Sequence, residues 1–244
     1  MHLTRRQEEA QAVLAGDSAH ILLFGGSRSG KTFLITRNIV MRALKAADSR
    51  HVIFRFRLNH LVASVFLDTF PKVMRLAFPG VDHATHVQDK YVTFGNGSEL
   101  WFAGLDDKDR TEKILGMEFA TVFFNEASQI PWQSVTTALT RLAQKAEQRI
   151  EGREPAPLKL RAYYDCNPPS KNHWTYRVFV EKRDPETREI LRTPDDYAHF
   201  SINPADNLEN LSPEYIGQLE SLPARMRVRF LEGRFADANP NALF

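Results

Sequence analysis

One short glycine-rich segment between two apolar runs constrains this chain most. Residues 25–32 read G-G-S-R-S-G-K-T, after the apolar run 21–24 and before the apolar run 33–35. The spacing of Gly25, Gly30, Lys31 and Thr32 fits the pattern G-x-x-x-x-G-K-[ST], in which backbone amides wrap a chain of phosphates. The sequence therefore predicts a strand, a tight glycine turn and a helix start in succession, which is the context that such a loop requires.

The residue types of this loop each have a chemical reason. Glycines let the backbone approach phosphate oxygens, the ammonium group of Lys31 can reach the β- and γ-phosphates, and the hydroxyl group of Thr32 can ligate Mg²⁺. The alternative is a turn rich in glycine and serine that binds nothing. We expect a site for ATP with Mg²⁺, in which the nucleotide is held by Gly25, Gly26, Ser27, Arg28, Ser29, Gly30, Lys31 and Thr32.

The order of the predicted elements indicates the fold class. A helix over 4–15, opened by a capping box of Thr4 and Gln7, precedes a strand over 20–24. A helix over 31–47, a strand over 51–56 and a helix from 61 to Pro71 or slightly beyond come next. Such alternation predicts an α/β fold with a mainly parallel sheet flanked by helices, where ligands bind at the carboxyl ends of the strands.

Later segments extend this pattern. An Asn-Gly turn at 96–97 predicts a hairpin between 91–94 and 99–102. Strands are expected at 120–124 and 158–164, with a helix over 131–148 between them. Segments 176–180 and 189–191 flank the charged residues 182–186, which predicts a hairpin tip. Ser212 and Pro213 begin a further helix, and a last helix covers 224–232.

A polar pair follows the strand predicted at 120–124. Hydrolysis of ATP needs a carboxylate that orients the attacking water, together with oxygen ligands for Mg²⁺. Asp usually serves the metal and Glu acts on the water, but this chain has Asn125 and Glu126. We therefore assign Glu126 as the catalytic carboxylate and Asn125 as a neutral partner of the metal or its waters. The metal site is expected at Thr32, Asn125 and Glu126; the alternative is that Glu126 only starts a surface turn.

Three further residues are candidates for contacts with the nucleotide. Arg28 could place its guanidinium group on the γ-phosphate as an arginine finger in cis, or be a solvated loop residue. Gln7 could bind the edge of adenine, although the capping box uses the same side chain. Asn167 follows the strand at 158–164 and precedes two prolines, where it is either a sensor of the γ-phosphate or a turn asparagine.

Composition narrows the function classes only slightly. The 244 residues are 43% hydrophobic and 25% charged, as in ordinary globular domains, and the net charge is +2. Residues 1–60 hold ten Lys/Arg against four Asp/Glu, which fits a polyphosphate site as well as a nucleic-acid face. No secretory signal or membrane-spanning run is present and Cys166 is the only cysteine, so we expect a cytoplasmic protein. His83 and His86 lack Cys or acidic partners, so we expect no zinc site.

With these motifs placed, the chain resembles the N-terminal ATPase half of bacteriophage terminase large subunits over nearly its whole length. Asn125 departs from the pattern, because many relatives carry Asp there, which puts tight Mg²⁺ binding in doubt. The segments that carry the resemblance are, in order, 25–32, 102–107, F-F-N-E-A at 123–127, C-N-P at 166–168, 173–174, 203–208, 215–216, 222–223 and 229–235.

The resemblance implies a RecA-like ATPase core over residues 1–170 and a small lid or linker subdomain over 171–244. It also implies an ATP-hydrolysing motor that moves double-stranded DNA into a procapsid inside an infected bacterial cell. The motor would act as a homo-oligomeric ring on a portal protein, with a small terminase subunit as a further partner. Gln7 would belong to the adenine-binding motif, Arg28 would be the loop arginine, Glu126 the catalytic carboxylate and Asn167 the coupling residue. Relatives continue into an RNase H-like nuclease, for which this chain has no room, so we expect no nuclease activity from it.

Other functional classes fit the same loop. A helicase with a similar core would unwind a forked substrate instead of packaging duplex DNA. A nucleotide-gated binding module, deprived of hydrolysis by Asn125, would release no phosphate with or without Mg²⁺. A small-molecule kinase is less favoured, because it would not need Glu126 directly after the strand.

Overall fold

The computed structural model describes residues 2–106, 114 and 116–237. The chain divides into two compact units: the first holds Thr32–Tyr163, and the second holds His2–Lys31 and Tyr164–Phe244. The predicted α/β class with a mainly parallel sheet is confirmed, because the chain forms an eight-stranded sheet in the order β10-β1-β9-β6-β2-β5-β4-β3. Its strands are β1 (His20–Phe24), β2 (Arg50–Arg55), β3 (His83–His86), β4 (Tyr91–Phe94), β5 (Glu99–Gly104), β6 (Thr121–Phe124), β9 (Arg161–Cys166) and β10 (Tyr197–Ser201).

In the first unit, β2 is the central parallel strand. It pairs in parallel with β5 on one side and with β6 on the other, with Phe54 opposite Phe124 in the second pairing. The antiparallel strands β4 and β3 complete the edge, so the predicted Asn-Gly hairpin is confirmed as β4 and β5. Gly97 has a φ of 81° in the turn, a backbone conformation that glycine adopts without strain. Because Phe54 pairs with Phe124, the parallel strands β2 and β6 end side by side, at Arg55 and Phe124.

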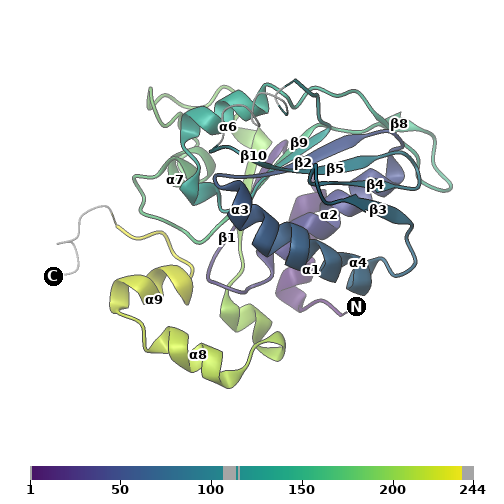
Figure 1. The fold of residues 1–244 in the computed structure, drawn as a ribbon. Coiled ribbons are helices and arrows are strands. Elements are labelled where there is room, and N and C mark those ends of the chain that lie inside the picture. Colours follow the sequence, from purple (N-terminus) through teal and green to yellow (C-terminus); the bar gives the residue numbers. More distant parts are fainter. Residues whose placement is uncertain (1, 107–113, 115, 238–244) are drawn as a thin grey trace. The chain divides into compact units, whose positions relative to one another are not determined.

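Helices cover both faces of these strands. Figure 1 shows α2 (Lys31–Lys45) behind them and a rod of α3 (Leu58–Leu61), η1 (Val62–Thr69) and α4 (Phe70–Ala77) in front. Phe66 and Phe70 of the rod pack edge-on against Phe102 of β5. We predicted that this helix ends near Pro71, but it continues to Ala77. A π-helical stretch ends at Thr69, so that Pro71 lies in the first turn of α4, where its missing N–H is tolerated.

The predicted helix over 131–148 is wrong in its second half. The helix α6 (Trp132–Leu139) is only eight residues long. Arg141 and Ala143 instead exchange backbone hydrogen bonds with Phe119, the residue two positions before β6. The rest of the segment leads into a small antiparallel pair, β7 (Glu147–Gln148) and β8 (Ala156–Pro157). Backbone pairing with a distant residue thus overrides the helical spacing of the apolar side chains.

The second unit carries the N-terminal helix and the C-terminal segments. The helix α1 (Arg5–Ala15) has the predicted capping box, and β1 pairs in parallel with β10, a strand that the sequence did not reveal. Ser212 caps α8 as predicted, and α9 ends two residues earlier than expected. The other elements of this unit are α7 (Trp174–Phe179), η3 (Pro194–Asp196), η4 (Pro204–Asn210), α8 (Pro213–Glu220) and α9 (Ala224–Phe230).

The hairpin tip predicted around residues 182–186 is only partly correct. Residues 174–179 form the helix α7, because the ring of His173 accepts a hydrogen bond from the amide of Thr175 and caps it. A single antiparallel bridge between Arg183 and Ile190 remains of the hairpin. The spacing of the apolar residues in this segment did not distinguish a helix from a strand, whereas the cap at His173 favours the helix.

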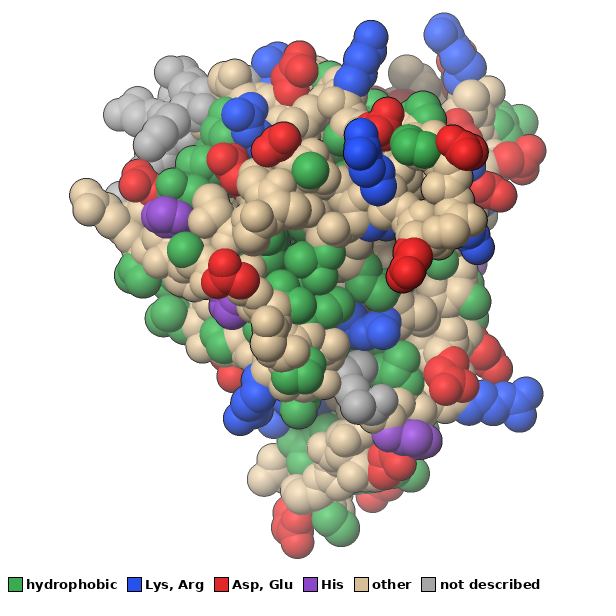
Figure 2. Space-filling view, turned by 90° about the vertical axis from the view of Figure 1, so that its right-hand side faces the viewer, with side chains coloured by type: hydrophobic (Ala, Val, Ile, Leu, Met, Phe, Trp, Pro, Cys, Tyr) green, Lys and Arg blue, Asp and Glu red, His purple; other side chains and the backbone are tan. Residues whose placement is uncertain are grey.

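One view of the described surface shows charges of both signs. On the face shown in Figure 2, Lys and Arg side chains are interspersed with Asp and Glu side chains. None of the described helices has the length and apolar character needed to cross a bilayer.

Candidate functional site

The loop after β1 has the backbone that the glycine pattern predicts. Gly25, Arg28 and Gly30 have φ angles of 142°, 55° and 95°, so three of six consecutive residues lie in the region that favours glycine. A side chain at Gly25 would place its Cβ 1.9 Å from the carbonyl oxygen of Ile202. The loop then passes into α2, which begins at Lys31. Such a succession of turns followed by a helix start directs amide groups toward a common anion.

The ammonium group of Lys31 lies within the loop. Its Nζ donates to the carbonyl oxygens of Gly25 at 3.1 Å and Gly26 at 2.6 Å, and to the hydroxyl of Ser29 at 3.1 Å. The Oδ1 atom of Asn167, after β9, lies 3.5 Å from the same nitrogen. Lys31 is 7% exposed. The structure thus brings together two predicted site residues, Lys31 and Asn167, that lie 136 positions apart in the sequence.

Gln7 links the first helix to the loop. Its Oε1 accepts from the amide of Thr4 at 3.2 Å, which closes the capping box. Its Nε2 donates to Oδ1 of Asn207 at 3.0 Å and lies 3.5 Å from the carbonyl oxygen of Ser29. A side chain at Gly30 would approach the same nitrogen to 2.9 Å. Gln7 is therefore positioned beside the loop, and its contact with adenine stays a prediction.

Two asparagines of the C-terminal part brace the loop, and the sequence reasoning missed both as site residues. Asn203 accepts from the amide of Gly26 at 2.9 Å, and Asn207 donates to the carbonyl of Arg28 at 2.8 Å. Both belong to the segment N-P-A-D-N at 203–207, within one of the segments that carried the family resemblance. The resemblance of that segment was the only available signal. A hydrogen bond between residues 177 positions apart produces no local pattern in the sequence.

The end of α9 also touches the loop. The carbonyl oxygen of Phe230 accepts from the amide of Ser27 at 2.8 Å. Gly233 follows with a φ of 61°, and a Cβ there would lie 1.8 Å from Oδ1 of Asn203 and 2.6 Å from the Cα of Gly25. Glycine is therefore required at 233 by the approach of Asn203 and of the loop backbone, and at 25 by the approach of Ile202.

Arg28 is exposed and its side chain lies over an aromatic ring. Its guanidinium carbon is 5.1 Å from the ring centre of Tyr215 on α8. This distance is that of a cation–π contact. The arginine predicted as a finger in cis thus has a defined resting partner within the second unit.

The remaining predicted residues belong to the first unit. Asn125 and Glu126 follow β6 directly, as expected, and Asn125 is 2% exposed. The amide nitrogen of its side chain lies 3.5 Å from the hydroxyl of Thr32. Glu126 has left-handed backbone angles, φ 52° and ψ 50°, which are costly for a residue with a side chain and recur at active sites. The structure thus brings Thr32 and Asn125 together and places Glu126 on a strained strand tip.

Arg55 is a further residue of this edge that the sequence reasoning missed. It ends β2, and its Nη1 donates to Oδ1 of Asn125 at 3.3 Å and to the hydroxyl of Ser64 at 2.8 Å. The position of Arg55 in the sequence could have revealed it. A charged residue at the carboxyl end of a buried parallel strand lies where ligands bind.

A metal at this edge would have few protein ligands. Within the part of the chain that the structure describes, no three His, Cys, Asp or Glu residues are grouped closely enough to hold a metal. The hydroxyl of Thr32 and the carboxylate of Glu126 offer oxygens that suit Mg²⁺, which commonly keeps several waters and takes its other ligands from phosphates. The side-chain oxygen of Asn125, the third residue expected at the metal, accepts from Arg55 instead. The donor set therefore fits a metal that arrives with a nucleotide.

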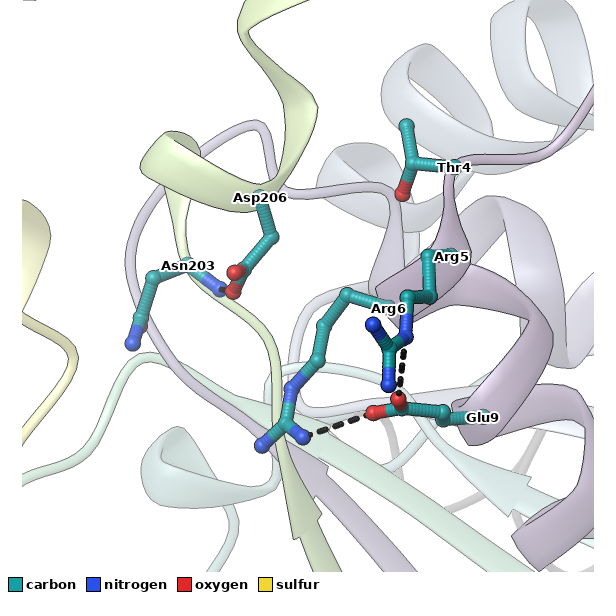
Figure 3. Close-up of a pocket in the computed structure, with 6 residues that line it drawn as sticks. All are labelled: Thr4, Arg5, Arg6, Glu9, Asn203 and Asp206. Atoms are coloured by element: carbon teal, nitrogen blue, oxygen red, sulfur yellow. Dashed lines mark hydrogen bonds and ion pairs between the residues drawn. The ribbon is translucent and has the colours of Figure 1, made fainter.

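A hollow of about 570 Å³ lies beside α1 in the second unit. Arg5 and Arg6 each form an ion pair with Glu9, at 3.3 Å and 2.9 Å. Figure 3 shows these two pairs, with Asn203 and Asp206 across the hollow from Glu9. Arg6 also donates to the carbonyl of Ser201 at 3.0 Å. Because Asn203 lines this hollow and binds Gly26, the hollow adjoins the start of the loop.

Comparison with protein families gives one match. A family model described as phage terminase large subunit matches residues 17–227. Among curated protein sequences, none matches the chain.

Solved structures share the fold. The large terminase of a thermophilic bacteriophage has a TM-score of 0.75 at 18% identity, over 97% of this chain and 54% of that chain. The same protein in complex with ATP-gamma-S has a TM-score of 0.71 at 18% identity, over 96% and 53%. The large terminase ATPase domain of Thermus phage P74-26 has a TM-score of 0.61 at 16% identity, over 92% of both chains. The chain thus spans about half the length of the first relative and nearly all of the isolated ATPase domain.

Proposed function

Because the chain belongs to the family of phage terminase large subunits, we propose that it is an ATP-hydrolysing motor domain that moves double-stranded DNA into a procapsid. The observation that carries this proposal is the loop at 25–31, whose backbone turns at glycine positions around the buried ammonium group of Lys31. A glycine-rich loop that turns into a helix start beside an ammonium group suits the binding of a polyphosphate. The relative crystallised with ATP-gamma-S has the same fold.

Each site residue has a proposed role in this reaction. The amides of residues 25–31 and Lys31 hold the phosphates, Thr32 provides a hydroxyl ligand for Mg²⁺, and Glu126 orients the attacking water. Mg²⁺, when bound, neutralises charge on the β- and γ-phosphates. Arg28 would leave Tyr215 to stabilise charge on the γ-phosphate, and Asn167, beside Lys31, would report the state of the phosphates to the chain that follows.

The wider machine is proposed on family membership. We propose an ATPase core over 1–170 and a lid or linker subdomain over 171–244, assembled as a homo-oligomeric ring on a portal protein, with a small terminase subunit as partner. The activity would take place in an infected bacterial cell. Double-stranded DNA is the proposed substrate of movement.

The main alternative is a nucleotide-binding module with weak hydrolysis. It is favoured by one observation, the presence of Asn125 where a carboxylate would serve the metal better. A helicase is a second alternative, because helicases have a similar phosphate loop. No described feature favours a helicase over the family assignment.

The proposal is tested by the rate of phosphate release as a function of protein concentration, with and without duplex DNA and Mg²⁺. We expect turnover that rises more than linearly with concentration, because a ring completes its sites from neighbouring copies, and a further rise with DNA. Glu126→Gln should abolish turnover and leave ATP binding intact. Glu118→Gln, the same change at an exposed position before the other end of β6, is a matched control. Turnover of Glu126→Gln at the wild-type rate would refute the assigned carboxylate, and ATP binding without any turnover would favour the binding module.

A further inference from the structure

Two side chains meet where β2 and β6 end in the first unit. The register places Phe54 opposite Phe124, and the backbone amide of Asn125 donates to the carbonyl of Phe54 at 2.8 Å. Arg55 and Asn125 therefore extend from the same carboxyl edge of neighbouring parallel strands. Their side chains are joined by the 3.3 Å hydrogen bond from Nη1 of Arg55 to Oδ1 of Asn125.

The chemistry of Arg55 determines how the amide of Asn125 is oriented. A guanidinium group only donates hydrogen bonds, so the atom that faces it must be the amide oxygen. The NH₂ group of Asn125 then faces the hydroxyl oxygen of Thr32, 3.5 Å away. The oxygen and nitrogen of an amide side chain are assigned from such networks, and here the donor-only neighbour leaves one assignment.

Arg55 is itself anchored by an uncommon backbone element. Ser64 lies in η1, a π-helix of eight residues, and its hydroxyl donates to the carbonyl of His60 at 2.7 Å. The oxygen of Ser64 is therefore left to accept from Arg55 at 2.8 Å. π-helices are rare and occur frequently at functional sites. The Nε of Arg55 is buried with no partner among the described residues, a cost that a purely stabilising side chain would avoid.

We propose that Arg55 is a positioning residue for the hydroxyl group of Thr32 and acts on it through Asn125. The proposal rests on the proposed function, in which Thr32 ligates Mg²⁺. Arg55 holds Oδ1 of Asn125, so Asn125 serves Thr32 as a hydrogen-bond donor and does not serve the metal as a ligand. The NH₂ group draws electron density from the Thr32 oxygen, whereas a carboxylate would accept a hydrogen bond from the Thr32 hydroxyl and strengthen that oxygen as a ligand. The Arg55–Asn125 pair thus sets a weak affinity for the metal.

The first test asks whether Asn125 is a donor or a metal ligand. Mn²⁺ binding is measured by electron paramagnetic resonance at saturating ADP for wild type, Asn125→Leu and Asn125→Asp. Asn125→Leu should leave the affinity unchanged or raise it, because Thr32 only loses a donor. Asn125→Asp should raise it by about tenfold. A loss of about tenfold in Asn125→Leu would show a direct ligand and overturn the proposal.

The second test separates orientation from charge. Arg55→Gln is measured alone and together with Asn125→Leu, so that loss of the positive charge cancels in the double-mutant cycle. Arg55→Gln should change the Mn²⁺ affinity by at least about threefold more in the wild-type background than in the Asn125→Leu background. Arg57→Gln, which removes an exposed charge two residues away, is the matched control and should be additive with Asn125→Leu. Equal effects of Arg55→Gln in both backgrounds would overturn the positioning role.

A third measurement requires neither nucleotide nor metal. Thermal unfolding of wild type, the two single variants and the double variant should show a smaller loss of Tm in the double variant than the sum of the single losses, because both changes break one hydrogen bond. Additive losses would overturn the contact itself. If wild type fails to bind ADP, the proposed function falls, and this cycle still decides whether Arg55 holds Asn125.

Discussion

The side-chain oxygen of Asn203 accepts a hydrogen bond of 2.9 Å from the amide of Gly26, although the two residues are 177 positions apart. Asn203 is fixed in turn, because its backbone N–H donates to Oδ2 of Asp206 at 2.8 Å. The start of the phosphate loop is therefore held by a preorganised side chain from the C-terminal part of the second unit. A nucleotide that binds to the loop should therefore affect the position of the segment around Asn203, and a change at Asn203 should affect nucleotide binding.

Asn203→Ala should destabilise the protein by about 1–3 kcal/mol, because the buried amide of Gly26 loses its acceptor. Asn203→Asp retains an acceptor and should unfold near the wild-type urea midpoint, yet its negative charge beside the loop should raise the Kd for ATP. Asn59→Ala, the same change at an exposed position, should leave both quantities unchanged. Urea unfolding and ATP titration measure the two effects; equal ATP affinity in Asn203→Asp and wild type would contradict the coupling.

Gly233→Ala should displace the segment after α9 from the loop. The new Cβ would lie 1.8 Å from Oδ1 of Asn203 and 2.6 Å from the amide nitrogen of Gly26, at a φ of 61° that disfavours any side chain. We expect a loss of stability of about 1–3 kcal/mol and weaker ATP binding. Gly217→Ala is the control: it lies within α8 with nothing within 4 Å, so it should be neutral or stabilising. Similar unfolding curves for the two variants would refute the close packing of Gly233.

Tyr215→Ala should release the guanidinium group of Arg28. A cation–π contact at an exposed position contributes about 0.5–1 kcal/mol, so release should lower the KM for ATP by about two- to fivefold if Arg28 then binds the γ-phosphate. Tyr215→Phe retains the ring and should match wild type. Steady-state ATPase assays compare the three proteins. A higher KM in Tyr215→Ala would show that Tyr215 supports the site directly instead of holding Arg28 away.

His20 should make the stability of the protein fall in mild acid. Burial lowers the pKa of His20 to about 4, an effect that the charge of Asp196 opposes only in part. In the unfolded chain its pKa is near 6.5, so between about pH 6.5 and 4 the unfolded state binds the proton and the folded state does not. Stability is therefore complete above about pH 6.5 and falls as the pH drops through this window, by up to about 3 kcal/mol from this residue.

His20→Asn should flatten this pH dependence when unfolding is followed by urea titration at several pH values. Some dependence should remain, because burial and the charge of Arg42 hold the pKa of His51 well below its usual value as well. His2→Asn, at an exposed position, is the control and should retain the wild-type slope. An unchanged slope in His20→Asn would show that His20 is not buried in its neutral form.

Local patterns in the sequence were sufficient for much of the fold. The capping box of Thr4 and Gln7, the glycine loop and the Asn-Gly hairpin were predicted correctly, because each depends on residues only a few positions apart. The helix over 131–148 was wrong because backbone partners of Arg141 and Ala143 lie at Phe119, outside any local window. The strand β10 was missed for the same reason, since it is defined by its pairing with β1.

The sequence alone determined which chemical groups this protein can offer to a polyphosphate: a glycine turn, Lys31, Thr32 and a polar pair after a buried strand. These follow from backbone sterics and residue chemistry within short segments, so they need no knowledge of the fold. Only the tertiary structure decided what holds those groups, namely Asn203 and Gly233 against the loop and Arg55 against Asn125. The physical reason is that hydrogen bonds and close approaches between distant segments depend on where the chain returns in space, which the side chains of one segment cannot encode.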